Sequence, residues 1–462
     1  MGINRLVDIG KSALFTAQQG ISVAGHNIAN VNTPGYSRQQ VSLAENRPEN
    51  ASPGQIGTGV HAESIRRSVD SFVDAQLLAS RERLGEFTAS SDALARLEPL
   101  FGDANNQGIG AGLNEFFDAL QDVTTNPNDL SARTVFLSKA TALAGRFNQS
   151  AADLTAAQGF LDRQVAQTIT DVNRLTSQIA DLNTKIADAE SSGQQANDLR
   201  DERGVALASL GELIEISSIE DATGQLTVSA GRGQVLVDKE RTYQLVGVAN
   251  LSNGLLDVHY DAGAGSTTSL NSVIESGRLK GLLDVRDQTI PSLQASLDTL
   301  ASELVTQVNQ QHRLGFGLDG STNLDFFAPT GTTASTISVS LTNVRQIAAS
   351  STAAGVPGNN ANALALAGLK NTDFVSFGNV TFQEYYSTIA GNFGSTAQGV
   401  ESNLSAQQIL HDQLTSQRAS ISGVSMDEEL ANLLQYQRSF EAASRMIVIA
   451  DELFQTILSI KR

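Results

Sequence analysis

The residue types that most often carry out chemistry in proteins are dispersed along this sequence. The five histidines lie in five separate segments, at positions 26, 61, 259, 312 and 411. None belongs to the H-E-x-x-H pattern of a zinc-binding helix, and there is no phosphate-binding G-x-x-x-x-G-K-[ST] loop or G-x-S-x-G nucleophile turn. The absence of cysteine excludes thiolate metal sites and cysteine nucleophiles. We therefore predict no catalytic residue, no cofactor and no metal site, and a protein that is not an enzyme.

Two polar groups could suggest chemistry, but their spacing favours a structural role. The run Arg200-Asp201-Glu202-Arg203 alternates in charge. On a helix, such alternation is typical of a solvated face joined by salt bridges. His312 lies in the last turn of a predicted helix, and we expect a cation near the helix C-terminus or a hydrogen-bonded packing residue.

Composition limits the class of protein. The chain has 462 residues, 40% of them hydrophobic, and a net charge of −18. Its length predicts two to four domains, at roughly 100–200 residues each. The acidic balance argues against binding to nucleic acid or to anionic membranes. No apolar run approaches the roughly 20 residues that span a bilayer, and no cleavable signal peptide is visible. These features predict a cytoplasmic protein unless export uses another route.

The most regular pattern lies at the two ends of the chain. Near the N-terminus, large apolar residues recur every seven positions, with small residues three positions further on: Val7, Leu14, Ile21 and Ile28, then Gly10, Ala17 and Ala24. The C-terminal region repeats the spacing with Leu433, Phe440, Ile447 and Phe454, then Tyr436, Ala443, Ala450 and Ile457. Such heptads are typical of a coiled-coil seam, in which large side chains fill the spaces beside small ones. We predict that the two terminal helices pair, although periodicity alone leaves packing into an ordinary core equally open.

The interior of the chain is predicted to form helices with a β-rich insert. Apolar periodicity predicts helices over 68–98, 154–189, 197–214 and 272–313, and over most of the chain from 381 onward. Short alternating runs separated by Gly and Asn predict strands within 37–63 and a small antiparallel β domain within 216–262. Residues 314–380 are predicted to be loops and strands, including 337–341. The fold class is therefore mainly α with a β-rich insert: a terminal coiled coil, a helical-bundle domain and a small antiparallel β outer domain.

This pattern divides the chain into four parts. Residues 1–70 with 421–462 form a discontinuous terminal assembly domain. Residues 71–215 with 272–313 and 381–420 form the helical-bundle core. Residues 216–271 form the β-rich outer domain. Residues 314–380 are a loop- and β-rich segment, and its assignment to the outer domain stays open.

Several segments resemble one known family. Residues 25–39, GHNIANVNTPGYSRQ, resemble the N-terminal signature of the bacterial flagellar axial proteins, which form the rod, the hook and the hook-associated layers. Residues 428–433, EELANL, and 436–443, YQRSFEAA, resemble the matching C-terminal signature. Within the family, YSRQ at 36–39 and the interior segments 198–203, 277–287, 308–312 and 325–327 resemble hook-associated members. The resemblance covers most of the chain and is weakest over 217–270 and 330–380.

The resemblance singles out an N-terminal axial motif that consists of Asn27, Asn30, Asn32, Pro34, Gly35, Tyr36, Arg38 and Gln39. Asparagine tolerates the left-handed conformation that often ends a helix, and a Pro-Gly pair fits the centre of a type II turn. We expect this motif to fix where the N-terminal helix ends and where the chain turns outward.

The resemblance also implies a function. It implies a structural subunit that self-assembles through its terminal helices at the junction between hook and filament. The implied partners are copies of the chain, the hook protein, the next hook-associated protein and a cytoplasmic export chaperone at the C-terminal helix. Nucleic acid and membrane insertion are excluded. The implied location is the extracellular flagellum, reached through the flagellar secretion channel without a cleaved signal peptide. Two alternatives stay open: a hook or distal-rod subunit, and an axial protein with an enzymatic outer domain.

Overall fold

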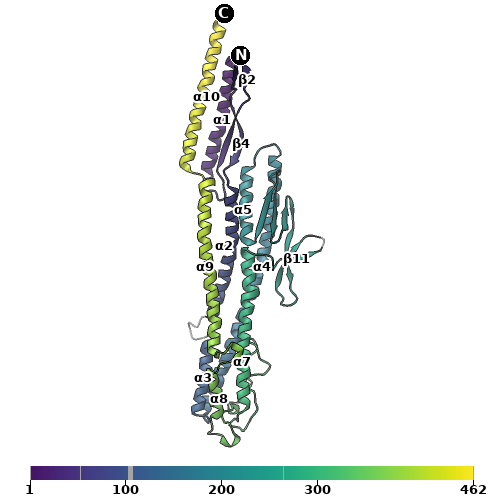
Figure 1. Cartoon of the computed structure of the whole chain (residues 1–462), viewed down its shortest axis with the longest axis vertical. Coiled ribbons are helices and arrows are strands. Elements are labelled where there is room, and N and C mark those ends of the chain that lie inside the picture. The colour runs from purple at the N-terminus through teal and green to yellow at the C-terminus, as the bar shows by residue number, and fades with distance from the viewer. Residues whose placement is uncertain (1, 52–53, 102–107, 264, 461–462) are drawn as a thin grey trace.

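The chain folds into an elongated molecule whose two termini lie at the same end (Figure 1). The computed structural model describes residues 2–51, 54–101, 108–263 and 265–460. Long helices run along the molecule, and small antiparallel sheets lie beside them. The predicted fold class is thereby confirmed.

The terminal region pairs the first helix with the last. Helix α1 (Gly2–Ala29) lies antiparallel to helix α10 (Met426–Ile460). A hairpin of β1 (Gln39–Glu45) and β4 (Val60–Arg67) packs along α1. Strands β2 (Glu49–Ala51) and β3 (Gly54–Ile56) continue this hairpin toward the end of the molecule where the termini lie. This hairpin meets α1 through long hydrogen bonds, from Val60 N to Ser12 Oγ at 3.4 Å and from Thr16 Oγ1 to Val60 O at 3.5 Å.

The body is a bundle of long helices. Its elements are α2 (Ser71–Phe101), α3 (Ile109–Thr125), α4 (Leu130–Glu190), α5 (Asn197–Leu213), α6 (Gly277–Asp284), α7 (Ile290–Arg313) and α9 (Phe382–Ser422). Helix α4 begins at Leu130 rather than near residue 154, because the Asp129 side chain accepts a hydrogen bond from Ser131 N and caps the helix. Its buried residues continue from Phe136 to Ile186, so one helix links both ends of the bundle.

A β lobe lies against the side of α4. Strands β5 (Ile216–Glu220), β6 (Leu226–Ala230), β7 (Gln234–Asp238) and β8 (Arg241–Thr242) form one antiparallel sheet. Strands β9 (Gln244–Ala249), β10 (Leu256–Asp261) and β11 (Thr267–Ser269) form a second. Asn183 and Asn173 of α4 bind the main chain of Leu226 and Leu245, and so attach one strand of each sheet to the helix.

The helix predicted over 272–313 is interrupted. It begins at Gly277, and a π-helical turn over Val285–Thr289 separates α6 from α7. Arg286, in this turn, is 1% exposed and donates to Asp162 Oδ1 at 2.7 Å and to Leu256 O at 2.8 Å. The turn therefore aims one buried guanidinium at both α4 and β10.

Residues 314–380 wrap the far end of the bundle around an aromatic core. Short helical segments lie at Val344–Gln346, Ala353–Gly355, α8 (Ala361–Gly368), Leu369–Asn371 and Val375–Phe377. The strand predicted over 337–341 is wrong, because Val339 forms an isolated bridge with Phe327 and the flanking residues continue no ladder. His312 is 1% exposed; its Nδ1 contacts Leu324 O at 2.7 Å and its Nε2 accepts from Ala348 N at 3.0 Å. Burial lowers its pKa, so His312 is the hydrogen-bonded packing residue of the two options that the sequence offered.

No helix in the described part of the chain is both long enough and apolar enough to cross a membrane.

A single carboxyl group holds the neck of the β lobe. Glu82 of α2 is 7% exposed; its Oε1 accepts from Ile216 N at 3.1 Å, where the chain enters the lobe. Its Oε2 accepts from Ser276 Oγ at 3.3 Å, where the chain leaves it. Burial raises the pKa of Glu82 to about 7, and the two hydrogen bonds only partly oppose that shift.

This neck predicts a pH-dependent stability difference. The pKa of Glu82 is higher in the folded chain than in the unfolded chain. The stabilising contribution of the protonated Glu82 to the free energy of unfolding is therefore complete below about pH 4.5 and is lost as the pH rises through 7. Glu82→Gln keeps an acceptor for Ile216 N without the charge. We expect it to stabilise the chain at pH 8 by up to about 3 kcal/mol, and to have little effect at pH 4.5, as measured by denaturant unfolding at both pH values.

The exposed Glu98 of the same helix provides the control, since Glu98→Gln should change stability equally little at both pH values. Equal effects of Glu82→Gln at pH 4.5 and pH 8 would contradict the assignment.

Candidate assembly interface

Two glycines let α1 and α10 approach closely. A Cβ atom at Gly10 would lie 2.8 Å from Ile447 Cγ1, and one at Gly20 would lie 2.5 Å from Tyr436 Cδ1. Both distances are shorter than real Cβ contacts, so these positions accept no side chain without a shift of the partner. The absence of a Cβ atom makes room for Ile447 and for the Tyr436 ring.

The close approach sets the register of the pair. Counting heptads from the contact of Gly10 with Ile447, Ala17 falls opposite Phe440 and Ala24 falls opposite Leu433. In the intervening layers the order reverses, and Leu14 falls opposite Ala443. The small residues are the buried ones: Ala17, Ala24, Ala443 and Ala450 are 3%, 2%, 2% and 0% exposed. Large and small residues therefore alternate across the seam.

The eight large residues predicted for the seam are less buried than these alanines. Seven are half-buried: Val7, Leu14, Ile21, Ile28, Leu433, Phe440 and Ile447. Phe454 is 45% exposed, because α10 continues there to the level where α1 begins. Within one chain, α1 thus covers only one side of α10.

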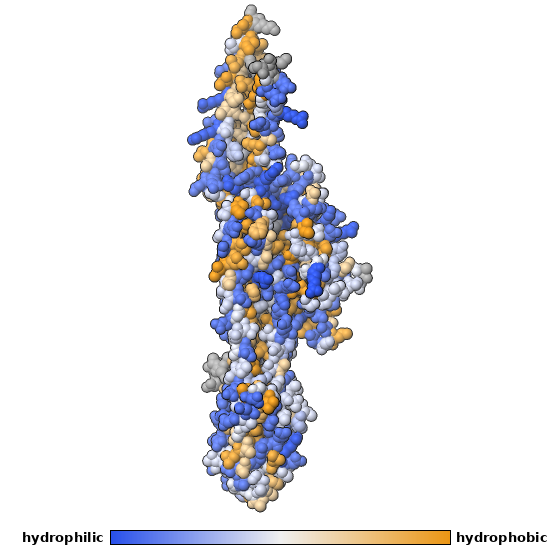
Figure 2. Space-filling model, viewed as in Figure 1, coloured by the Kyte–Doolittle hydropathy of each residue, from blue (hydrophilic) through white to orange (hydrophobic). Residues whose placement is uncertain are grey.

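The sides of α10 that face away from α1 are also apolar. The exposed large apolar residues on these sides include Leu430, Leu434, Val448, Ile449, Leu453, Leu458 and Ile460. Figure 2 shows apolar residues at the surface of this end of the molecule. Contiguous exposed apolar surface is typical of sites of association in soluble proteins.

The axial motif folds into the turn that follows α1. Asn30 Nδ2 donates to His26 O at 3.0 Å and satisfies one of the last carbonyls of the helix. Gly35 has φ +81°, and Tyr36 N donates to Thr33 O at 3.2 Å, as a type II turn requires. A Cβ at Gly35 would also lie 2.2 Å from Val205 Cγ2. Asn32 and Pro34 lie on the exposed side of this turn.

At the centre of the motif, Asn27 is fully buried and uses its whole side-chain amide. Its Nδ2 donates to Gln39 O and to Glu429 Oε2, both at 2.9 Å. Its Oδ1 accepts from Tyr36 OH at 2.7 Å and from Gln39 N at 3.0 Å. One side chain therefore joins the end of α1, the start of β1 and the start of α10.

Glu429 completes this group. It is 2% exposed, and its Oε1 accepts from Arg38 Nε at 2.8 Å. Arg38 NH1 also donates to the exposed Glu428 at 2.8 Å. We call Asn27, Tyr36, Arg38, Gln39 and Glu429 the terminal node. The pKa of Tyr36 is raised, first by burial and then by Asp198, Asp201 and Glu429, so its hydroxyl stays a donor.

The first turn of α5 joins the terminal node to the body. Asp198 Oδ1 accepts from Gln39 Nε2 at 2.7 Å. The Asp201 carboxylate accepts from Ser37 N and from Arg67 NH1, each at 2.8 Å. These contacts fix the terminal pair to the body.

The prediction that residues 200–203 form a solvated face is wrong. Asp201 and Arg203 are 8% and 4% exposed. Arg203 donates to Asn183 Oδ1, to Gly224 O and to Glu220 Oε2, which lie on α4 and on the β lobe. The salt bridges exist, but they are interior contacts between elements.

Sequence reasoning missed several residues of this interface. Gly20, Tyr436 and Glu429 were not predicted as a contact set, and Asp201 was assigned to a solvated surface. A signal for Glu429 was present, because it lies seven residues before Tyr436 and therefore in the apolar seam. A carboxylate at such a position requires partners.

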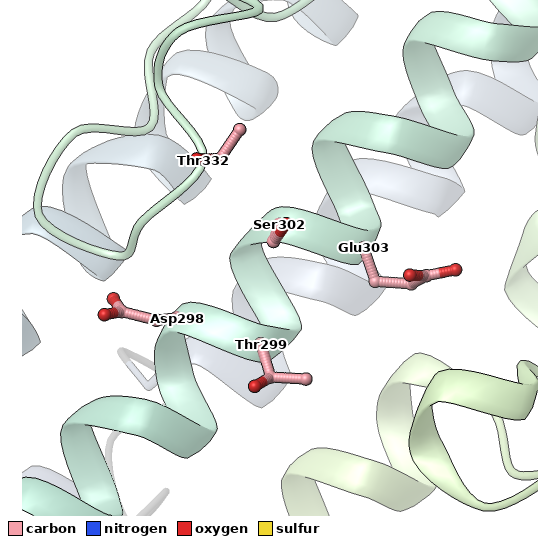
Figure 3. A pocket seen from close by; sticks show the side chains of 5 residues that line it. All are labelled: Asp298, Thr299, Ser302, Glu303 and Thr332. Atoms are coloured by element: carbon pink, nitrogen blue, oxygen red, sulfur yellow. The ribbon is translucent and has the colours of Figure 1, made fainter.

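A pocket beside α7 is lined by Asp298, Thr299, Ser302, Glu303 and Thr332, and the two carboxylates point to opposite sides of the helix (Figure 3). Asp298 is already bound to Ala334 N at 2.7 Å. Within the described residues, no three His, Asp or Glu side chains are grouped to hold a metal ion.

The family models that match this chain describe flagellar proteins. The family model of the flagellar hook-associated protein FlgK helical domain matches residues 94–327. The ends match two rod families: the flagella basal body rod protein at residues 8–36, and the C-terminal region of the flagellar basal body rod FlgEFG protein at 415–460.

The relatives that match over nearly the full length of this chain share the same name. Flagellar hook-associated protein 1 of Bacillus subtilis is 29% identical, over 98% of this chain and 97% of the relative. The proteins of that name from Salmonella typhimurium and Escherichia coli are 23% and 22% identical, over 99% of this chain and 100% of each relative.

A solved structure shows the same fold. The flagellar hook junction protein FlgK from Burkholderia pseudomallei superposes with a TM-score of 0.68 at 20% identity, over 75% of this chain and 100% of that chain. The helical-domain match covers half of the chain, and the curated relatives match it from end to end. This chain therefore belongs to the family of flagellar hook-associated protein 1, FlgK.

Proposed function

We propose that this chain is a non-enzymatic structural subunit that forms the junction between hook and filament by self-assembly through its terminal helices. The observation that carries the proposal is the α1–α10 pair, which buries alanines on its inner side and leaves large apolar residues exposed on the other sides of α10. The family context supports it, since the matched families and relatives are structural components of the flagellum.

The partners follow from the position of such a subunit. Copies of the chain would cover the exposed sides of α10. The hook protein and the next hook-associated protein would contact the two faces of the resulting layer. Residues 1–70 with 421–462 serve as the assembly domain, residues 71–215 with 272–313 and 381–420 as the bundle, and residues 216–271 and 314–380 as outer parts.

The place of action is the extracellular flagellum, which the chain reaches through the flagellar secretion channel. Before export, the apolar sides of α10 are exposed to the cytoplasm, where such a surface promotes aggregation. A small helical export chaperone that accepts the amphipathic helix in a groove would protect it.

The assembly proposal is tested on the outer side of α10. Leu434 and Val448 are 55% and 57% exposed, so Leu434→Asp with Val448→Asp should leave the fold of the single chain intact. In an assembled layer the two carboxylates would be buried without partners. We expect the fraction of hooks that carry filaments, counted by electron microscopy, to fall by roughly ten-fold or more. The circular dichroism of the purified chain should not change.

Thr456→Asp provides the matched control, because Thr456 is an exposed polar residue of the same helix. Normal filaments on the double variant would show that these sides of α10 are not the assembly surface.

The chaperone proposal is tested with a peptide that spans residues 424–462. We expect the purified export chaperone of the same flagellar system to bind this peptide, as measured by calorimetry. Phe440→Ala with Ile447→Ala should weaken binding by roughly ten-fold or more, because two apolar anchors on one face are lost.

Thr456→Ala in the same peptide should bind as the parent does. Equal affinity of the parent and double-alanine peptides would place the chaperone site elsewhere.

A further inference from the structure

Helix α9 is attached to the rest of the body by different kinds of contact in its two halves (Figure 1). In the first half, Tyr386, Ile389 and Phe393 are buried in the main apolar core, and the centre of the Phe393 ring lies 5.0 Å from that of Phe101. Within residues 404–422, all of which the structure describes, Leu414 is the one apolar residue that is buried, and it lies outside that core. The second half of α9 therefore depends more on polar contacts. We call residues 404–422 the α9 strap.

The polar contacts of the α9 strap are made with α2. Gln407 Nε2 donates to Ser80 O at 3.1 Å and to Ser80 Oγ at 2.9 Å. Arg418 Nε donates to Asp74 Oδ1 at 3.0 Å. His411 lies between these two contacts along the helix, so any change in its charge acts on the middle of the attachment.

A pair of buried nitrogen atoms without partners lies at this middle position. His411 Nδ1 and Arg81 Nε of α2 are both buried, and neither has a hydrogen-bond partner. Burial lowers the pKa of His411, and the charge of Arg81 lowers it further, while Asp412 of α9 and Glu212 of α5 oppose this shift. The attached strap thus favours the neutral form of the imidazole ring.

The sign of the resulting pH dependence follows from the position of this pKa. When the strap opens, the His411 ring enters water and returns to an ordinary pKa of about 6.5. Because the pKa in the attached state is lower, the contribution of neutral His411 to the attachment is complete above about pH 6.5 and is lost as the pH falls. Between pH 7.5 and pH 5.5, this linkage favours the open strap by up to roughly ten-fold.

We propose that the α9 strap is an acid-sensitive element, whose attachment to α2 weakens when His411 takes up a proton beside Arg81. Both ends of the strap stay held, since the first half of α9 lies in the core and Ser422 O accepts from Arg38 N at 2.8 Å. The change is therefore a local opening between fixed ends and not a detachment of the helix. It concerns the single chain and does not depend on the proposed function.

Hydrogen exchange of the purified full-length chain, followed by mass spectrometry, tests the proposal. Exchange rates are measured at pH 7.5 and pH 5.5 and are divided by the intrinsic rates of an unfolded chain at each pH. We expect the protection of residues 404–422 to fall by about five- to ten-fold at pH 5.5. The protection of residues 382–400 should not change.

Three variants identify the group that titrates. His411→Gln keeps a polar side chain that takes up no proton in this range, so the fall in protection should disappear. Arg81→Gln removes the like charge beside His411 and should make the fall smaller, since burial of the ring still disfavours its charged form. His61→Gln is the matched control: His61 is an exposed histidine of the hairpin, and the parent response should persist.

Several outcomes would overturn the proposal. Equal protection of residues 404–422 at both pH values would show that the strap does not respond to acid. An undiminished fall in His411→Gln would assign the response to another group. A fall of the same size over residues 382–400 would show a loss of stability throughout the bundle, to which buried His312 contributes, and not a local opening.

Discussion

Asparagine side chains attach the extended segments of this protein to its helices. Each side-chain amide forms the pair of hydrogen bonds that the main chain of a neighbouring strand would form. Asn27 donates to the carbonyl of Gln39 and accepts from its amide. Asn173, Asn183 and Asn309 do the same for Leu245, Leu226 and Phe327. A primary amide carries a donor and an acceptor in one plane, so it satisfies both main-chain groups of a residue on the side where no strand pairs with them.

This arrangement solves a problem that an elongated molecule creates. Its strands cannot lie at the centre of a large sheet, and a buried main-chain group without a partner is costly. Polar contacts of defined geometry also hold the elements in a unique position, which large apolar contacts between smooth helix faces do less well. Two arginines serve a similar purpose. Arg286 binds both Asp162 of α4 and the Leu256 carbonyl of the β lobe, and Arg203 of α5 binds the Gly224 carbonyl and the Glu220 carboxylate of the lobe.

Prediction from the sequence was correct for those parts of the fold in which the spacing of apolar residues along the chain corresponds to the buried face of a helix or strand. The apolar repeat over 161–186 corresponds to buried residues of α4, and the alternating runs of the β lobe form strands. Prediction was wrong where partners lie far apart in the chain. The sequence predicts a solvated Arg203 because it does not reveal that Glu220 lies beside it. The seam position of Glu429 likewise does not reveal that Asn27 is its partner. The order of residues 314–380 likewise comes from distant side chains such as Asn309, His312 and Arg133, which local propensity cannot report.

Helix α4 gives the molecule the mechanics of a strut. Its 61 residues form one uninterrupted rod of about 90 Å that bears both the aromatic tip and the β lobe. A load applied along this rod finds no interior joint at which to bend. The long helices are interrupted instead where α9 gives way to α10 and where α1 ends at Ala29, beside the terminal node. If the chain assembles as proposed, bending of the subunit would concentrate at these breaks and leave the body straight.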